Sequence, residues 1–234
     1  MRRTPESPDT PVHSGLHGRH KGKKLRSAQS RLMEDLLPRL AVPVGTEPLD
    51  PAALFDFPYD ALVVEIGFGG GEHIAHEAAA NPNTAFIGCE PFVNGVAKLV
   101  ALIDRDGHRN IRIHPHNALD LLARLPQASV DRVDLLYPDP WPKRRQRKRR
   151  FVSLDSLAAM ARALKPGHEL RFATDIDDYA AWTLTRVEAS PEFEWRAQAS
   201  GDWTAPWPGW RPTRFEERAR KEGRGSAYLT FMRV

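Results

Sequence analysis

From residue 61 to the end of the chain, short apolar stretches alternate with longer stretches of helical periodicity. Apolar runs of four to eight residues are typical of buried strands, and apolar residues spaced three or four apart are typical of amphipathic helices. The expected strands are 62–66, 85–89, 110–114, 130–137, 169–173, 192–196 and 227–232. The expected helices are 72–80, 92–104, 118–125, 151–164 and 176–189. Repeated strand–helix units predict an α/β fold, with a mostly parallel sheet and helices on both faces.

The segments before residue 61 do not indicate a second globular domain. Residues 1–31 are basic, rich in proline, glycine and histidine, and lack an apolar period, so we expect a flexible arm. Whether this arm contacts RNA or is a tail without function stays open at this point. Residues 32–60 should form a short helix over 32–40 and a proline-rich connector, and residues 61–234 the folded domain. Between the last two strands we expect a long loop, whose tryptophans could stack on an RNA base or cover the sheet edge: Trp203, Trp207 and Trp210.

The charge of the chain is unevenly distributed. The net charge is only +4, but Lys and Arg concentrate in residues 19–31 and 143–150, a pattern that indicates local contacts with phosphate. The single cysteine, Cys89, excludes an internal disulfide and fits a reducing compartment. No apolar run approaches the ~18 residues of a membrane span, and the first residues lack the apolar core of a signal peptide. We therefore expect a cytoplasmic protein with no membrane partner.

The strand expected at 130–137 leads into the sequence Pro-Asp-Pro-Trp (138–141). Each proline restricts its own φ and disfavours the helical region for the residue before it, so Asp139 should be held extended at the strand end. Seven of the eight residues 143–150 are Lys or Arg. A basic run alone is usually a solvated surface, but open α/β sheets bind ligands at the carboxyl ends of their strands. A rigid acid followed by a cation block therefore favours a site for a polyanion.

The first strand of the sheet ends in a glycine turn, Glu-Ile-Gly-Phe-Gly-Gly-Gly-Glu (65–72). Glycines at a strand–helix turn let the backbone approach a ligand closely. The nicotinamide fingerprint Gly-x-Gly-x-x-Gly fails, because Glu72 stands at its last position. A second acid, Glu90, ends the second strand, where it could bind ribose hydroxyls. Two acids and no cation beside the turn favour a ligand with positive charge, such as S-adenosylmethionine; the alternative is a tight turn without a ligand.

Four motifs together resemble those of bacterial tRNA (guanine-N7-)-methyltransferases. They are Glu-Ile-Gly-Phe-Gly (65–69), Gly-Cys-Glu (88–90), Pro-Asp-Pro-Trp-Pro-Lys (138–143) and Thr-Arg-Phe-Glu (213–216), in an order and with gaps that fit the family from about residue 60 onward. The resemblance implies a class I methyltransferase fold, which is Rossmann-like with a seven-stranded sheet. It also implies methyl transfer from S-adenosylmethionine to N7 of the guanosine at position 46, in the variable loop of tRNA.

The resemblance also implies roles for individual residues. Asp139 would be the catalytic residue. The methyl donor would be bound by Glu65, Gly67, Gly69, Glu90, Asn117 and Asp139. The substrate would be bound by Lys143, Asp175, Thr213, Arg214, Phe215 and Glu216. From its charge, we expect the rest of the basic run to contact the RNA backbone, through Arg144, Arg145, Arg147, Lys148, Arg149 and Arg150.

The chain departs from the family pattern at two positions. Many members carry an acid where this chain has Asn117, at the usual place for contacting adenine. The asparagine oxygen can still accept a hydrogen bond, but without charge assistance, so the affinity for the donor would be affected. Gln146 stands where the basic run commonly has a histidine, and a neutral polar side chain there should change little.

The chemistry of this reaction agrees with one acid at the strand end. Guanine N7 carries a free lone pair and no proton, so its attack on a methyl group needs no general base. The purine becomes cationic as the sulfonium is neutralised, and a nearby carboxylate favours that transition state electrostatically. We therefore expect Asp139 to position the guanine and to stabilise the developing charge.

Two other kinds of function remain open from the sequence. One is a methyltransferase that acts on an exocyclic amino group or on another RNA; the other is an RNA-binding module without catalysis, which would leave the two acids and the glycine turn without a purpose. We expect no metal site, because no coherent set of acids or cysteines joins the histidine pairs His73/His76 and His114/His116. The sequence leaves the choice between monomer and homodimer open.

Overall fold

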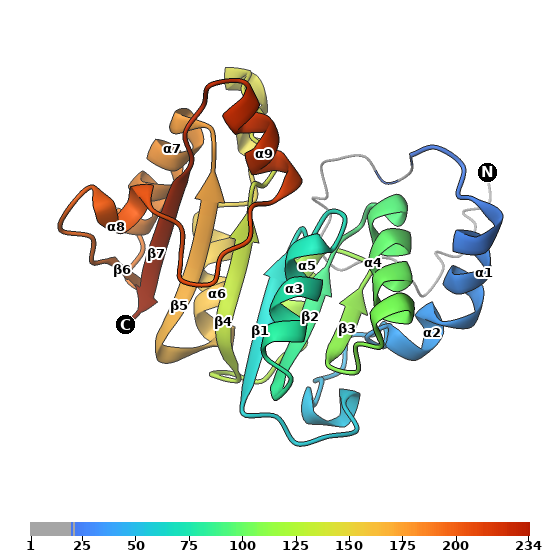
Figure 1. Cartoon of the computed structure of the whole chain (residues 1–234). Helices are drawn as coiled ribbons and strands as arrows, with labels where there is room; N and C mark the ends of the chain where they lie inside the picture. The colour runs from blue at the N-terminus through green and yellow to red at the C-terminus, as the bar shows by residue number, and fades with distance from the viewer. Residues whose placement is uncertain (1–19, 21) are drawn as a thin grey trace, which may run out of the picture.

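One seven-stranded sheet forms the centre of the protein (Figure 1). The computed structural model describes residues 20 and 22–234. The strand order is β3-β2-β1-β4-β5-β7-β6, and β7 runs antiparallel to both of its neighbours while the pairs among the first five strands are parallel. The strands are β1 Ala61–Ile66, β2 Thr84–Cys89, β3 Ile111–His114, β4 Val130–Leu136, β5 Leu164–Thr174, β6 Phe193–Trp195 and β7 Ala227–Arg233. The expected seven-stranded, mostly parallel sheet is confirmed.

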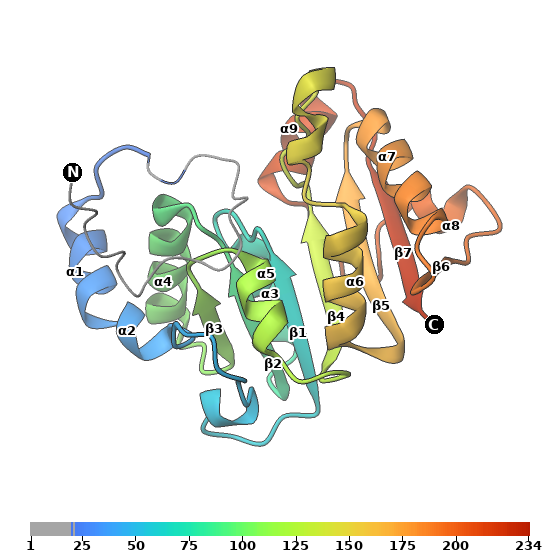
Figure 2. The same ribbon diagram turned by 180° about the vertical axis from the view of Figure 1, so that it is seen from behind.

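Helices cover both faces of the sheet, as expected. Helices α3 and α4 lie on the face seen in Figure 1, and α5, α6 and α7 lie on the face seen in Figure 2. Their bounds are α3 Glu72–Ala80, α4 Val93–Asp106, α5 Ala118–Arg124, α6 Leu154–Ala163 and α7 Asp177–Glu188. The alternation of side chains along a strand explains the two cores. Leu62 and Val64 of β1 pack with the α5–α6 side, whereas Val63 between them packs with α3 and α4.

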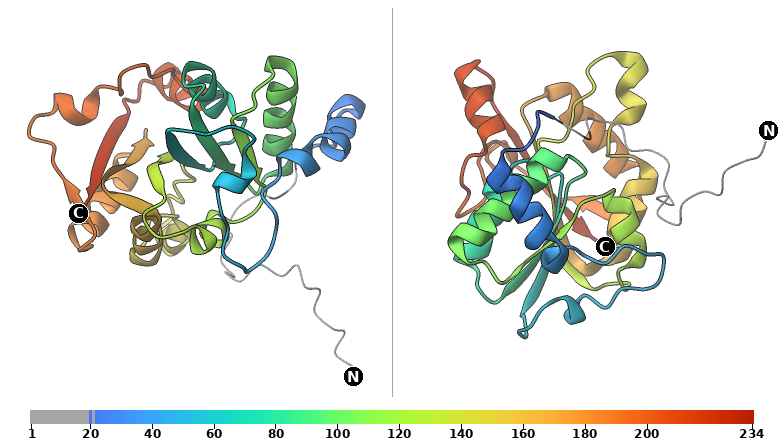
Figure 3. Two further views of the ribbon diagram at one scale, coloured as in Figure 1. Left: turned by 90° about the horizontal axis from the view of Figure 1, so that it is seen from below. Right: turned by 90° about the vertical axis from the view of Figure 1, so that its right-hand side faces the viewer.

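The helix expected at 32–40 begins earlier and is interrupted. It forms α1 Ser27–Asp35 and α2 Leu37–Leu40. Pro38 lies in the first turn of α2, where its missing N–H is tolerated but prevents one continuous helix. Apolar residues of α1 pack beside α4, so α1 lies along the outer side of α4 (Figure 3). Most of the expected arm, residues 1–19 and 21, lies outside the described residues.

The described end of the arm contacts the start of α4. The backbone N–H of Val93 donates to the His20 carbonyl at 3.1 Å. The side chain of Asn94 bridges the same segment: its oxygen accepts from Gly22 N at 2.8 Å, and its nitrogen donates to the Lys23 carbonyl at 2.7 Å. This segment therefore lies next to the loop between β2 and α4.

Two later segments differ from the sequence-based expectation. Strand β5 begins at Leu164, directly after α6, so the residues expected to end a helix belong to the strand; Gly167 adopts a positive φ of 76° there. The loop expected after β6 contains two short helices, α8 Gly201–Thr204 and α9 Arg214–Lys221. The remaining short helices are η1 Ala52–Leu54 and η2 Arg144–Arg149. Among the described residues, none of the helices is long and apolar enough to cross a membrane.

Candidate active site

The glycine turn after β1 is held by the acid at the end of β2. Gly67, Gly69 and Gly71 all have positive φ, between 59° and 80°, which side chains with a β-carbon rarely adopt. One carboxylate oxygen of Glu90 accepts from Gly69 N at 2.8 Å, and the other accepts from Phe92 N at 2.9 Å. The turn and the expected ribose-binding acid therefore form one preorganised unit.

Glu65 lies beneath this turn as one partner of a buried pair. Its carboxylate is 2.8 Å from Nδ1 of His73, which belongs to the first turn of α3. Burial raises the pKa of Glu65, and the neighbouring His73 only partly offsets that effect. Burial also opposes the charge on His73, but the charge of Glu65 and the hydrogen bond to it prevail, so the His73 pKa is raised. The two side chains therefore form a close hydrogen-bonded pair in a buried environment.

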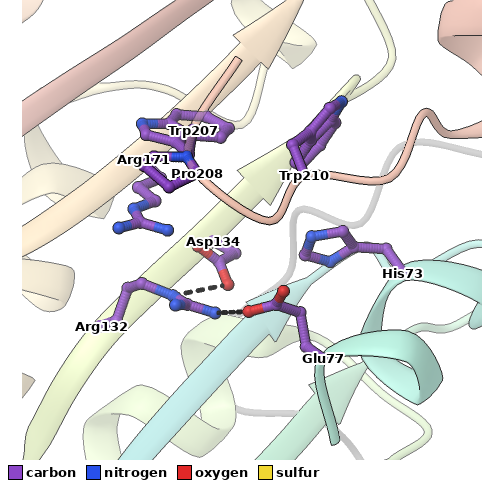
Figure 4. A pocket seen from close by; sticks show the side chains of 8 residues that line it. All are labelled: His73, Glu77, Arg132, Asp134, Arg171, Trp207, Pro208 and Trp210. Atoms are coloured by element: carbon purple, nitrogen blue, oxygen red, sulfur yellow. Dashed lines mark hydrogen bonds and ion pairs between the residues drawn. The ribbon is translucent and has the colours of Figure 1, made fainter. Parts of the chain in front are cut away.

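The His73 member of this pair lies beside a larger charged cluster of Glu77, Arg132 and Asp134 (Figure 4). Asp134 of β4 lies near Glu65 and His73, with one ligand atom of each within 4.8 Å of the others. Arg132 donates to Asp134 at 3.0 Å and to Glu77 at 2.8 Å. The sequence did not join these acids to His73, because they come from β1, α3 and β4. His73 and Arg132 already pair with these acids, and the expected absence of a metal stays a prediction.

Asn117 has a structural partner that the sequence did not reveal. Its side-chain oxygen accepts from Leu119 N at 3.1 Å and caps the N-terminus of α5. Asparagine is among the best N-cap residues, which explains its place at this helix start. The oxygen expected to accept from adenine therefore already accepts the hydrogen bond of the cap, which leaves it one lone pair, and the amide nitrogen can act only as a donor.

The loop after β4 carries Asp139 as expected, but its geometry is more strained than two prolines alone would require. Tyr137 and Trp141, which flank Pro-Asp-Pro, have positive φ values of 50° and 42°. Tyr137 N donates to the Ala173 carbonyl at 2.7 Å, and its hydroxyl donates to Ser226 Oγ at 2.9 Å. The loop is therefore anchored to β5 and to the segment before β7.

Asp139 itself is exposed at the surface and lies within electrostatic reach of the glycine turn. Its charge raises the pKa of Glu90, in addition to the larger effect of burial. Partial desolvation by the surrounding loop raises the pKa of Asp139. Asp139 has no salt-bridge partner among residues 20 and 22–234. An acid of this kind at the end of β4, beside the turn after β1, is suited to stabilise a developing positive charge.

The basic run forms helix η2, and its cations have different surroundings. Lys143, Arg144, Arg145 and Lys148 are exposed. Arg147 is half-buried and pairs with Asp178 at 2.7 Å, and the Arg149 guanidinium lies 5.0 Å from the centre of the Trp141 ring. The run therefore offers a smaller set of unrestrained cations than its composition suggests.

The expected contact between Arg150 and the RNA backbone is wrong. The side chain of Arg150 is fully buried. It donates to the Pro140 carbonyl at 2.8 Å, pairs with Asp178 and lies against the rings of Tyr179 and Trp182. A guanidinium in these contacts cannot reach a phosphate. It instead ties the Pro-Asp-Pro loop to α7.

Arg150→Ala should lower the free energy of unfolding by about 2–4 kcal/mol. It removes the hydrogen bonds to the carbonyls of Pro140 and Asp178 and the packing against two aromatic rings. The measurement is urea or thermal unfolding. The matched control is Arg149→Ala, which removes an exposed neighbour and should change stability by less than about 1 kcal/mol. Equal effects of the two substitutions would contradict the structural role of Arg150.

The segment 213–216 lies over the glycine turn. The Thr213 side chain caps α9 by accepting from Glu216 N at 3.2 Å, and Arg214 and Phe215 are exposed. A β-carbon placed on Gly69 would lie 3.5 Å from Arg214 and 3.6 Å from the ring of Phe215. The charge of Arg214 also lowers the pKa of Glu90, against the larger effect of burial. Two of the expected substrate residues are thus near the expected donor site.

Two other expected substrate residues have partners within the protein. Glu216 is fully buried and accepts from Trp210, Arg220 and Tyr228. Direct contact of Glu216 with a substrate is therefore wrong for this conformation, because no part of its side chain is accessible. Asp175 is half-buried and pairs with Arg224 at 2.7 Å.

The tryptophans of the loop after β6 divide between two environments. Trp207 and Trp210 are half-buried and pack with Leu136, Ala173 and Tyr228 of the neighbouring strands β4, β5 and β7, so they cover inner strands of the sheet and not an edge strand. Trp203 is exposed. The contact of Trp210 with His73 and Glu216 had no sequence signal beyond the clustering of tryptophans.

Comparison with known proteins identifies methyltransferases as relatives. A family model described as "Putative methyltransferase" matches residues 60–229. The chain is 54% identical over 217 residues to the tRNA (guanine-N(7)-)-methyltransferase of Nitrobacter winogradskyi, covering 92% of this chain and 84% of that protein. It is 52% identical over 218 residues to the tRNA (guanine-N(7)-)-methyltransferase of Rhizobium meliloti, covering 93% and 94%.

A solved structure supports the fold. The chain aligns with a mutant of the 16S rRNA (adenine(1408)-N(1))-methyltransferase from Catenulisporales acidiphilia, with a TM-score of 0.55 and 14% identity over 83% of this chain and 97% of that one. At this identity the likeness concerns the fold alone, and it confirms the class I architecture. The matches to these two curated relatives cover 92% and 93% of the chain. The chain therefore belongs to the tRNA (guanine-N(7)-)-methyltransferase family.

Proposed function

We propose that this protein transfers a methyl group from S-adenosylmethionine to N7 of a guanosine in tRNA, at position 46 of the variable loop. The observation that carries the proposal is the position of Asp139 at the end of β4, close enough to the glycine turn for its charge to act on Glu90, in a chain of this family. Because the proposed substrate is tRNA, the enzyme would work in the cytoplasm.

The residues at the turn fit S-adenosylmethionine. A β-carbon on Gly67 would meet no atom of the described part of the chain within 4 Å, so these residues leave space at the turn. A β-carbon on Gly95 would lie 2.1 Å from the Gly69 carbonyl. Glycine at 95 thus lets α4 approach the turn closely. The acids Glu65, Glu90 and Asp139 suit a ligand with sulfonium and ammonium charges, and the donor supplies the electrophilic methyl group. Each oxygen of Glu90 accepts one backbone hydrogen bond and retains a lone pair for a ribose hydroxyl.

Asp139 would act on the guanine. N7 has no proton to lose, so the carboxylate serves to orient the base and to stabilise the positive charge that develops on the purine. Proximity and in-line alignment of N7 with the methyl group would supply much of the remaining rate acceleration. The backbone is anchored on both sides of Asp139, at Tyr137 and at the Pro140 carbonyl. This supports the role, because a preorganised carboxylate needs no rearrangement in the transition state.

The RNA would lie across the carboxyl edge of the sheet. The exposed cations Lys143, Arg144, Arg145 and Lys148 are suited to bind phosphates there. The exposed ring of Phe215, above the turn, could stack on a base of the variable loop. Thr213 would contribute by capping the helix that presents this ring.

The test is an incubation of the protein with labelled S-adenosylmethionine and unmodified tRNA, followed by identification of the methylated nucleoside. 7-Methylguanosine is expected, and a tRNA with adenosine at position 46 should accept no label. A product methylated on an exocyclic amino group would replace the proposal by the amino-group alternative. Binding of tRNA without donor binding and without any product would support an RNA-binding module instead.

Asn117→Asp should tighten donor binding about three- to tenfold. One carboxylate oxygen would keep the cap on α5, and the other would accept from the adenine amino group, where the asparagine now presents a nitrogen donor. Calorimetry with S-adenosylhomocysteine measures the change. Asn117→Ser is the control, because serine keeps the cap without reaching the ligand. If Asn117→Asp leaves the affinity for S-adenosylhomocysteine unchanged, Asn117 does not contact the adenine.

A further inference from the structure

Trp210 lies where the two halves of the active site meet. On one side its ring contacts the His73 ring, with centroids 4.9 Å apart (Figure 4). On the other side its indole Nε1 donates to Glu216 at 2.7 Å. His73 and Glu216 belong to α3 and α9, which are far apart in the sequence. Trp210 is thus a physical link between the helix after the glycine turn and the helix that starts above it.

The Glu216 end of this link determines the position of the segment over the turn. Glu216 is fully buried, and a buried carboxylate is tolerated only when hydrogen bonds compensate for its lost hydration. Trp210 and the hydroxyl of Tyr228, at 2.8 Å, supply two of these bonds. Arg214 and Phe215 directly precede Glu216 in the first turn of α9. Holding the Glu216 carboxylate therefore holds the exposed side chains that lie over Gly69.

The His73 end reaches the floor of the donor site. His73 Nδ1 is 2.8 Å from the carboxylate of Glu65, which stands two residues before Gly67, the first glycine of the turn. Both side chains are buried. A movement of Glu65 when a donor binds would therefore be felt by the His73 ring and by the indole packed against it. The chain of contacts is continuous from Glu65 through His73 and Trp210 to Glu216.

We propose that Trp210 is a positioning residue that couples donor binding to tRNA binding. This inference rests on the proposed function, because it takes tRNA as the second ligand. Donor binding would restrict the motion of Glu65 and His73. Because Trp210 packs against His73 and donates to Glu216, the first turn of α9 would become more ordered as well. By thermodynamic linkage, bound tRNA would raise donor affinity by the same factor as bound donor raises tRNA affinity.

Trp207 offers a matched control in the same cluster. It is half-buried like Trp210, lies 5.5 Å from the Tyr228 ring, and donates its Nε1 hydrogen to Thr230 Oγ1 at 2.8 Å. Its hydrogen bond thus goes to β7 rather than to Glu216. Tryptophan-to-phenylalanine changes at 207 and 210 remove the same N–H group and the same ring volume, but only the change at 210 breaks the proposed link.

The experiment measures the affinity of S-adenosylhomocysteine by calorimetry, with and without unmodified tRNA. In the wild type we expect tRNA to tighten this binding about tenfold, within the usual range of coupling between sites. Trp210→Phe should reduce the factor to about twofold or less and raise KM for tRNA about five- to tenfold, with kcat less affected. Donor affinity without tRNA should stay within about twofold, because a phenyl ring still contacts His73. Trp207→Phe should retain the wild-type coupling.

Three outcomes would overturn the proposal: no coupling in the wild type, wild-type coupling in Trp210→Phe, or an equal loss in Trp207→Phe. Tyr228→Phe removes another hydrogen bond to Glu216 and should also lower the coupling. It replaces Trp210→Phe as the test if that variant does not fold. Hydrogen–deuterium exchange of residues 213–217 with and without S-adenosylhomocysteine tests the link without RNA. We expect S-adenosylhomocysteine to protect these residues from exchange in the wild type but not in Trp210→Phe, and this result does not depend on tRNA being the substrate. Equal protection in both proteins would overturn the link.

Discussion

Asp139→Asn is expected to lower kcat for tRNA methylation by a hundredfold or more. The substitution keeps the shape of the side chain but removes the negative charge that favours a cationic purine, and losing one preorganised transition-state contact typically has an effect of this size. Binding of tRNA should change little, because phosphate contacts dominate it. Single-turnover rates with saturating donor and tRNA measure the effect on the chemical step.

The pH dependence of kcat is an independent test of whether turnover needs the ionised carboxylate of Asp139. Partial desolvation raises the pKa of Asp139, so the carboxylate gains a proton at a higher pH than an ordinary aspartate. The ionised form is the active one; kcat should therefore be level above this pKa and fall as the pH decreases through it. In Asp139→Asn the acid limb should disappear.

The control for Asp139→Asn is Asp155→Asn, which neutralises an exposed acid in the first turn of α6. It should leave kcat within about twofold of the wild type. If folded Asp139→Asn turns over at nearly the wild-type rate, Asp139 does not stabilise the developing charge. Recovery of the variant at high pH would point to general-base chemistry and to an amino-group substrate.

Replacing Arg144, Arg145 and Lys148 together by alanine is expected to weaken tRNA binding on the order of a hundredfold at ~0.15 M salt. Each phosphate contact contributes about 0.7–0.9 to the slope of log affinity against log salt, so three lost contacts should flatten the slope by about 2–3. Arg147 and Arg150 are excluded from this variant because both pair with Asp178 and their loss would also perturb α7. Filter binding over a range of salt concentrations measures both quantities.

Donor affinity should be unchanged in the triple variant, since η2 does not include the glycine turn. Lys165→Ala is the control, because Lys165 lies near the opposite, amino end of β5 and pairs with Asp131. It should leave the slope as it is. If the slope of log tRNA affinity against log salt is the same in the triple variant and the wild type, the basic run is an ordinary solvated surface and does not bind phosphates.

The elements that position the site could be predicted because their causes are local. Apolar runs of strand length separated by helical periods predict parallel strands, and the expected strands 62–66 and 85–89 agree with β1 and β2 to within a residue at each end. The expectation was weaker where competing local signals met. Lys-Pro-Gly at 165–167 resembles a helix end and turn, but Leu164 before it pairs with Val130 of β4 and Glu169 after it pairs with Arg132. The segment therefore lies at an irregularity within the long strand β5.

The site residues were predictable as a set, but their individual environments were not. The Pro-Asp-Pro sequence restricts the backbone around Asp139, whereas the positive φ of Tyr137 depends on anchors at Ala173 and Ser226. Asn117 was expected near adenine, and its role as the cap of α5 depends on where that helix begins. Backbone restriction is a property of neighbouring residues; anchoring is a property of the packed sheet.

The sequence by itself determined the order of strands and helices, the glycine turn with its acid, and the presence of an acid and a cation block after β4. Only the tertiary structure decided which charges remain available to a ligand. Arg150 and Arg144 have the same side chain in the same run, yet one is buried against α7 and the other is exposed. Glu216 is buried by Trp210 and Tyr228, which precede and follow it in the chain. Desolvation and pairing arise from residues brought together by folding, and these contacts leave no periodic or compositional signal.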